Sequence, residues 1–455
     1  FKNLLLADFT VRRDGSSRFS SAYRYGVFPA GSLGIRLTEL KAFSKLSWLD
    51  DLKARAGWGK TGNQLIPNVY NAFTLYTADP ANNGYDISGA GTSVSGGFDL
   101  TQFGNPNGKW ETTTSTNVGF DANLFRNRLE VVFDWYTRTT SDMLAQIAVA
   151  RAQGQGTLPF TNIGTMRNRG IDLNLNWSDK AFNGQIRYSI GVNITQYKNE
   201  VLKLNNDPNA TLFGFTTRLP SITATKKGYP IASFYGYFVD GILNAQQAAT
   251  APKFGTYTRE GVFNFRDVNK DGVITAADRD FLGNPHPDFI YGINLSAGYK
   301  NWDLSMFAKG QQGGDIFNYV RYWTDFNVFQ GNRSKRMLYE SYGEGGKNLL
   351  PRLNSSDATS QQVSSYFIED GSCLRLGNIQ LTYTIPNNIM KKVGISGAQV
   401  YIQGQNLLTL TKYTGLDPDI NLRTSDANNQ DFHMGIDEGA YPVAKSILFG
   451  LQLKF

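Results

Sequence analysis

An acidic twelve-residue segment near the middle of the chain holds the residues with the clearest chemistry. Oxygen-bearing groups recur at the spacing of a calcium-binding loop. The residues at these positions are Asp267, Asn269, Asp271, Val273, Thr275 and Asp278. Calcium is a hard cation that takes oxygen ligands, and here they would be the side chains, the Val273 carbonyl and Thr275, directly or through water. Gly272 permits the sharp turn that such a loop needs.

The segment departs from the usual loop at its last ligand, where Asp278 replaces a longer Glu. A shorter carboxylate must come closer to the ion to bind it through both oxygens. The alternative is a polar turn of the Asx type with no metal. We expect one structural calcium ion here, and nothing in the sequence indicates a redox or organic cofactor.

A second group consists of aromatic residues within one expected loop. Its members are Tyr319, Tyr322, Trp323, Phe326 and Phe329. Over a pore, such rings could stack on sugars and form a weak substrate-binding site. Alternatively, they pack the loop onto its neighbours or onto a partner protein. The sequence leaves both alternatives open.

No catalytic set is evident. The two histidines, His286 and His433, fall in different loops, and His286 stands between two prolines, which suits a rigid turn. The single cysteine, Cys373, excludes an internal disulfide and lies in a strand-like run, where we expect it to be inert. The sequence therefore does not indicate an enzyme.

The elements that must position these loops are strands with a two-residue period. From Ile171 to Trp177 the odd positions are apolar and the even positions are polar, so one face is apolar and the other wet. Comparable runs reach about ten residues, the length of membrane-spanning strands rather than of sandwich strands. The pattern predicts an all-β fold, a transmembrane antiparallel β-barrel.

Twelve spanning strands are expected. Their ranges are 3–13, 25–37, 52–60, 110–123, 129–141, 165–177, 185–197, 287–299, 301–311, 372–384, 397–409 and 443–455. Short and long connections alternate, with the long ones at 61–109, 142–163, 198–287, 311–371 and 411–441. Barrels of the outer membrane place short turns in the periplasm and long loops outside. We assign the extended segment 228–243 to an outer loop, and expect helix at 385–392 and within 315–342.

The alternation also predicts which side chains face lipid. Apolar residues of the strands should face outward: Trp177, Ile190, Phe133, Leu451 and Phe449. Polar residues should face the lumen: Asp172, Asn174, Arg187, Asn193 and Gln452. Coordinates with the polar group on the lipid side would overturn this register.

Composition agrees with a barrel. Aromatic residues make up 13% of the 455 residues, glycines number 47, and charged residues are few at 18%, as membrane interfaces, tight turns and a lipid-facing surface require. The formal charge of +7 comes from scattered residues, which argues against nucleic-acid binding. No stretch is apolar enough for a transmembrane helix, and no signal peptide is present, so we expect a fragment that starts inside a fold.

Several segments resemble a known family, the SusC/RagA-type TonB-dependent outer-membrane transporters. They are RDGSSRF at 13–19, LKARAGWGKTGN at 52–63, NP at 105–106 with KWETT at 109–113, NIGTMRNRGI at 162–171, FIEDGS at 367–372 with LRL at 374–376, and QNLL at 405–408 with YTGLDP at 413–418. Together, in this order, they cover nearly the whole chain. One departure is Cys373, where the family usually has Phe.

The resemblance implies that residues 1–455 are the C-terminal part of a 22-stranded barrel in the bacterial outer membrane. The missing N-terminal part would hold the plug, the TonB-contacting segment and the first strands. Family members import oligosaccharides or peptides with energy passed by TonB, and they pair with a SusD-like surface lipoprotein. A passive porin or adhesin-like barrel is the alternative function, and a soluble carbohydrate-binding β-protein is the third.

Overall fold

The computed structural model describes most of the chain. The residues that it leaves out are 1, 44, 67, 79–82, 87, 90–94, 147–155, 206, 208, 215–217, 327–330, 344, 355, 391–393 and 421–429. Within the described residues, no helix is long and apolar enough to cross a bilayer.

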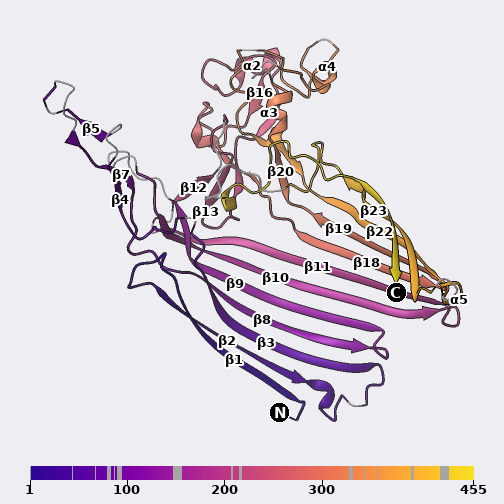
Figure 1. The fold of residues 1–455 in the computed structure, drawn as a ribbon. Coiled ribbons are helices and arrows are strands. Elements are labelled where there is room, and N and C mark those ends of the chain that lie inside the picture. The colour runs from indigo at the N-terminus through magenta and orange to yellow at the C-terminus, as the bar shows by residue number, and fades with distance from the viewer. Residues whose placement is uncertain are drawn as a thin grey trace.

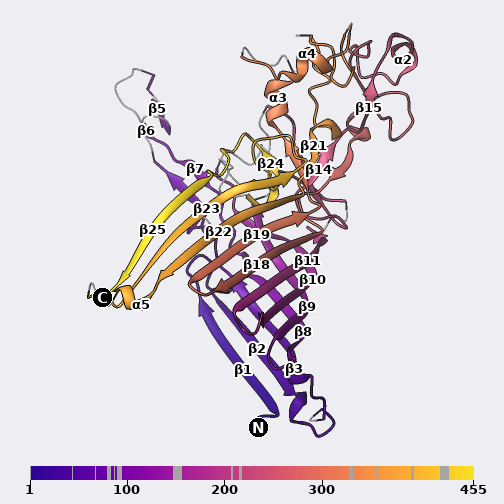
Figure 2. The same cartoon turned by 90° about the vertical axis from the view of Figure 1, so that its right-hand side faces the viewer.

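One antiparallel sheet of twelve strands dominates the molecule, and its strands follow one another in chain order. They are β1 (Leu5–Gly15), β2 (Tyr25–Arg36), β3 (Leu49–Asn63), β8 (Glu111–Leu124), β9 (Leu129–Gln146), β10 (Phe160–Ala181), β11 (Ile186–Leu204), β18 (Phe289–Tyr299), β19 (Trp302–Gln312), β22 (Cys373–Ile385), β23 (Gly397–Thr411) and β25 (Ser446–Lys454). The sheet curves strongly, with β1 and β25 at its two edges (Figures 1 and 2). All twelve expected strands are therefore confirmed.

The register separates the two faces as expected. On the apolar face, Trp177 stands opposite Ile190 and Phe133 opposite Leu173. Phe449 and Leu451 likewise stand opposite the apolar residues Ile402 and Val400. On the other face, Asn174 stands opposite Asn193. The remaining polar residues assigned to the lumen, Asp172, Arg187 and Gln452, lie opposite Thr195, Lys180 and Gln399 on the same face. No residue of the predicted lumen group falls on the apolar face.

The connections are unequal at the two ends of the sheet. Short turns join β8 to β9, β10 to β11 and β18 to β19, and the expected helical turn appears as α5 (Asn387–Met390) between β22 and β23. The 3-10 helix η1 (Leu37–Glu39) lies at this end too. The long connections all leave from the opposite end (Figure 1), which the architecture of outer-membrane barrels places at the cell surface.

Small elements fill the long connections. The first carries the paired strands β4 (Leu75–Thr77) with β7 (Asp99–Gln102) and β5 (Gly84–Tyr85) with β6 (Ser95–Gly96). The later connections carry β12 (Thr211–Gly214), β13 (Thr223–Lys226), β14 (Ser233–Gly236), β15 (Val239–Ile242), α2 (Ala245–Thr250), β16 (Phe263–Phe265), η3 (Ala276–Asp278), β17 (Asp280–Gly283), β20 (Asp315–Asn318), α3 (Val320–Thr324), α4 (Arg336–Glu340), η4 (Ser365–Phe367), β21 (Ile368–Asp370), η6 (Gln430–Phe432) and β24 (Ile436–Asp437). The segment 228–243 thus lies outside the main sheet, and helices occur within 315–342, as expected.

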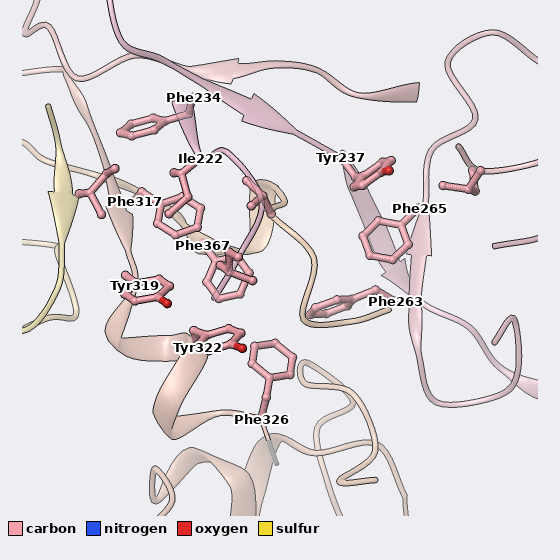
Figure 3. Packing of buried hydrophobic residues seen from close by; sticks show 14 residues of the cluster. Ile222, Phe234, Tyr237, Phe263, Phe265, Phe317, Tyr319, Tyr322, Phe326 and Phe367 are labelled. Carbon is pink, nitrogen blue, oxygen red and sulfur yellow. The ribbon is translucent and has the colours of Figure 1, made fainter. Parts of the chain in front are cut away.

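These later connections fold together into a unit that we call the cap, comprising the described residues of 205–288, 313–372 and 412–445. Its apolar core draws on all three segments. Phe234 comes from the first segment, and Phe317 and Phe367 come from the second (Figure 3). Ile436 comes from the third. Pairing of β20 with both β21 and β24 joins the second and third segments. The cap is therefore a folded body with its own core.

Candidate functional site

The polar face of the sheet lines a hollow that runs below the cap. Its wall around β10, β11, β18 and β19 is rich in amide and hydroxyl side chains. They include Asn174, Asn176, Ser189, Asn193, Ser296, Ser305 and Asn378. Such groups can both donate and accept hydrogen bonds, and Glu130 lines the same pocket, so this wall suits a polar solute better than an apolar one.

A charged network crosses the same face between β3 and β9. Arg55 donates from Nε to Asp121 at 3.0 Å and binds Asp134 through two nitrogen–oxygen contacts of 2.6 Å. Lys53 binds the other oxygen of Asp121 at 2.6 Å. These side chains are only partly buried, so each pair stabilises the fold by about 1 kcal/mol at most. The network chiefly fixes where charge lies along the wall.

Gly119 leaves space for the Arg55 side chain to cross β8 and reach Asp134 on β9. Gly119 on β8 lies directly between Arg55 and Asp134 in the register. A Cβ atom here would stand 2.6 Å from Oδ1 of Asp134, so a side chain would displace the carboxylate. Sequence reasoning missed this network because alternation predicts the face but not the register. The available signal was the set of charged residues on the polar side of three consecutive strands.

The proposed calcium loop lies in the cap between β16 and β17, and its last carboxylate is fully buried. Asp278 accepts the backbone N–H of Val268 at 2.9 Å and that of Thr275 at 2.8 Å, one on each oxygen. Burial alone would raise the pKa of Asp278, but the N–H donors of Thr275, Val268 and Asn269 outweigh it and the pKa is lowered. The carboxylate therefore stays charged at neutral pH and ties the two ends of the loop together.

The first half of the loop is organised in the same way. Asp267 accepts N–H groups from Lys270 at 2.6 Å and from Gly272 at 2.7 Å, and Gly272 adopts a φ of +84°. The bridge to Lys253 uses the Gly272 carbonyl and the Ile274 N–H, so it does not involve the Val273 carbonyl. A carboxylate has about four lone-pair directions, so these hydrogen bonds leave room for a cation.

In the described part of the chain, however, no three His, Cys, Asp or Glu side chains gather as a metal site would require. The Asp267, Asp271 and Asp278 carboxylates are arranged around backbone donors instead. The amide of Asn269 donates to Asp271 at 2.9 Å, which would have to change if both residues bound an ion. Calcium binding stays a prediction of the sequence.

The aromatic candidates occupy the cap core. Tyr319, Tyr322 and Phe326 are buried there (Figure 3). Trp323 packs partly buried against this core. The Tyr319 and Tyr322 rings stack with centroids 5.3 Å apart. Buried rings cannot stack on a solute, so the geometry supports packing of the loop, the second alternative left open by the sequence. Phe329 lies outside the described residues.

His286 has a positional role in the structure. Its Nδ1 lies 3.3 Å from the Tyr197 hydroxyl and its Nε2 lies 3.1 Å from the Ile231 carbonyl. Burial lowers the pKa of His286 despite the hydrogen bond to Ile231, so the ring is neutral at physiological pH. It connects β11 to the cap where the chain enters β18.

Long strands with one apolar and one polar face, unequal connections and a folded cap define a transmembrane β-barrel of the outer-membrane class. The family model described as "TonB dependent receptor-like, beta-barrel" matches residues 2–407. The chain therefore belongs to the TonB-dependent receptor family, whose SusC and RagA members are outer-membrane proteins. The family consists of receptors and transporters rather than enzymes.

Individual relatives agree with this assignment. The chain is 32% identical to TonB-dependent receptor P3 of Formosa agariphila over 98% of its own length and 44% of that protein. It is 30% identical to TonB-dependent receptor SusC of Bacteroides thetaiotaomicron, over all of its own length and 42% of that protein. A solved structure of the RagAB peptide transporter superposes with a TM-score of 0.81 at 28% identity, covering 99% of this chain and 46% of that one. The chain thus spans less than half the length of these relatives.

Proposed function

We propose that the protein containing this chain imports a large polar nutrient, an oligosaccharide or a peptide, across the outer membrane with energy from TonB. In this proposal residues 1–455 form the C-terminal part of a 22-stranded barrel, and a SusD-like surface lipoprotein closes over the cap. The observation that carries the proposal is the wall of amide and hydroxyl groups beneath a folded cap. The likeness to a peptide transporter at 28% identity favours peptides as one cargo class.

Growth and energy dependence test this proposal. Deletion of the gene should abolish growth on the cognate oligosaccharide or peptide as sole carbon source, and loss of TonB should have the same effect. A passive porin, the alternative function, would keep transporting without TonB. Unimpaired uptake of every oligosaccharide and peptide supplied to the deletion strain would contradict import.

We also propose that Asp267, Asn269, Asp271 and Asp278 bind one calcium ion, with the Val273 carbonyl and Thr275 completing its shell. The support is the ligand spacing together with the ordered turn around Gly272. Three carboxylates within twelve residues repel one another at neutral pH, so a cation would stabilise the loop. The ion would be structural, and a site with a dissociation constant of about 10⁻⁴ to 10⁻³ M would fill outside the cell.

Asp271→Ala should remove this binding, because it deletes one carboxylate and leaves the spanning strands unchanged. Calorimetric titration of the chelated protein with calcium measures the effect, and we expect at least a tenfold loss of affinity. Asp280→Ala is the matched control, since Asp280 is an exposed carboxylate just outside the loop. Equal binding in wild type and Asp271→Ala, or none in wild type, would remove the site.

A further inference from the structure

The outward face of the sheet changes from apolar to polar at one row of residues near its cell-surface end. Below this row the face is apolar, with Val118, Trp135 and Ile171 side by side on β8, β9 and β10. Trp135 is 44% exposed on this face, as is common for tryptophan at the boundary of a membrane. The boundary of the lipid-facing band therefore lies at this level.

The next outward-facing row is polar and basic. It runs from Thr116 on β8 through Thr137 and Arg169 to Lys198 on β11, each residue directly opposite the next. Two residues along a strand span about 7 Å, so on each strand this row lies just beyond the apolar band. We call these four residues the rim patch.

Arg169 and Lys198 are two exposed cations that stand directly opposite each other on the outward face. Like charges at such positions destabilise a sheet. The nearby carboxylate of Glu200 binds Arg167 at 2.8 Å and reaches Arg169 and Lys198 only through longer-range attraction. Among the described residues, neither cation of the pair forms an ion pair or a side-chain hydrogen bond. An anion from outside the chain would offset their repulsion.

We propose that the rim patch binds the phosphate group of a lipid in the outer leaflet. Arg and Lys are the side chains that bind phosphate most strongly, and Arg does so through paired N–H groups. The hydroxyls of Thr116 and Thr137 can donate further hydrogen bonds. The apolar surface immediately below accommodates the acyl chains of the same molecule. This inference depends on the membrane location of the barrel and not on its cargo.

Lipid binding to the full-length receptor tests the proposal. The protein is purified in a neutral detergent and titrated with monophosphorylated lipid A, with the same lipid after removal of its phosphate, and with inorganic phosphate. Each basic residue near an anionic headgroup strengthens binding about fivefold. The double variant Arg169→Gln, Lys198→Gln should therefore bind the phosphorylated lipid about 25-fold more weakly, and Arg169→Lys should stay within about threefold of wild type.

The control variant is Arg138→Gln. Arg138 lies opposite Asn168, one residue from Arg169, on the lumen face of the same region. The Arg138→Gln substitution therefore removes one positive charge from the same part of the wall, but on its other side. Its lipid affinity should equal that of wild type. Equal binding by the double variant, equal binding of the dephosphorylated lipid, or an equal response to inorganic phosphate alone would each overturn the proposal.

Discussion

Asp417→Ala should loosen the third segment of the cap from the barrel, with a local cost of about 3–5 kcal/mol. Asp417 binds the guanidinium of Arg375 on β22, and the two side chains are only 9% and 4% exposed. Removal of the carboxylate would leave the buried Arg375 cation with only the more exposed Asp419 carboxylate, 3.9 Å away. Hydrogen exchange of residues 412–419 and 438–445 should therefore accelerate strongly while the spanning strands remain protected.

The same carboxylate also holds two backbone positions. It accepts the N–H of Asp419 at 2.9 Å and that of Val443 at 3.1 Å, so it joins the exit from β23 to the entrance of β25. Burial would raise the pKa of Asp417, but these donors and Arg375 outweigh it and lower the pKa below the ordinary 3.8. A lowered pKa means that the stabilisation is complete at neutral pH and is lost as the pH falls below about 4.

A matched surface pair provides the control. Lys309 binds Asp419 at 2.7 Å, with 51% and 42% of the side chains exposed, so Lys309→Met should change stability by less than about 1 kcal/mol. Replacement of both buried partners, Arg375→Met with Asp417→Leu, should recover the part of the loss that comes from the lone buried charge, but not the part that comes from the N–H groups of Asp419 and Val443. If the amide hydrogens of residues 412–419 and 438–445 exchange no faster in Asp417→Ala than in Lys309→Met, the buried pair does not anchor this segment.

The sequence predicted the main sheet well because a two-residue period is local information. The expected strands 165–177 and 185–197 appear as β10 and β11, but both extend further at the cell-surface end. Towards this end the two strands carry polar residues on both faces, with Arg167 opposite Glu200 on one face and Asn168 opposite Asn199 on the other. Alternation of hydrophobicity therefore stops while backbone pairing continues. Pattern reasoning therefore finds the part of a strand that lies in lipid and misses its continuation into water.

The cap could not be predicted in the same way. Its core brings Phe234, Phe317 and Ile436 together from segments separated by many residues, and none of these segments has a regular period. The buried pair of Arg375 and Asp417 raises the same difficulty, because nothing local links a strand residue to a loop residue 42 positions later. The two candidate sites predicted from the sequence, the calcium loop and the aromatic group, each consist of residues that lie close together in the chain.

Phe317→Ala should unfold much of the cap without disturbing the barrel. Phe317 is fully buried on β20. Its ring stacks on that of Phe367 with the ring centroids 5.0 Å apart, and its centroid lies 6.1 Å from that of Phe234. Phe-to-Ala changes in a packed core cost about 3–5 kcal/mol. The barrel strands are held by their own hydrogen-bonded ladder, so limited proteolysis should cut the cap segments first and leave the twelve-stranded sheet intact.

Leu338→Ala is the control for Phe317→Ala. It shows whether the effect comes from disruption of the buried core or from loss of any apolar side chain in the cap. Leu338 lies on α4 in the same cap but is 74% exposed, so its removal should change stability by less than about 0.5 kcal/mol. Equal protease resistance of the two variants would show that the apolar cluster does not hold the cap together. If only Phe317→Ala is cut, and cargo uptake falls with it, then transport requires the folded cap above the polar wall as well as the barrel.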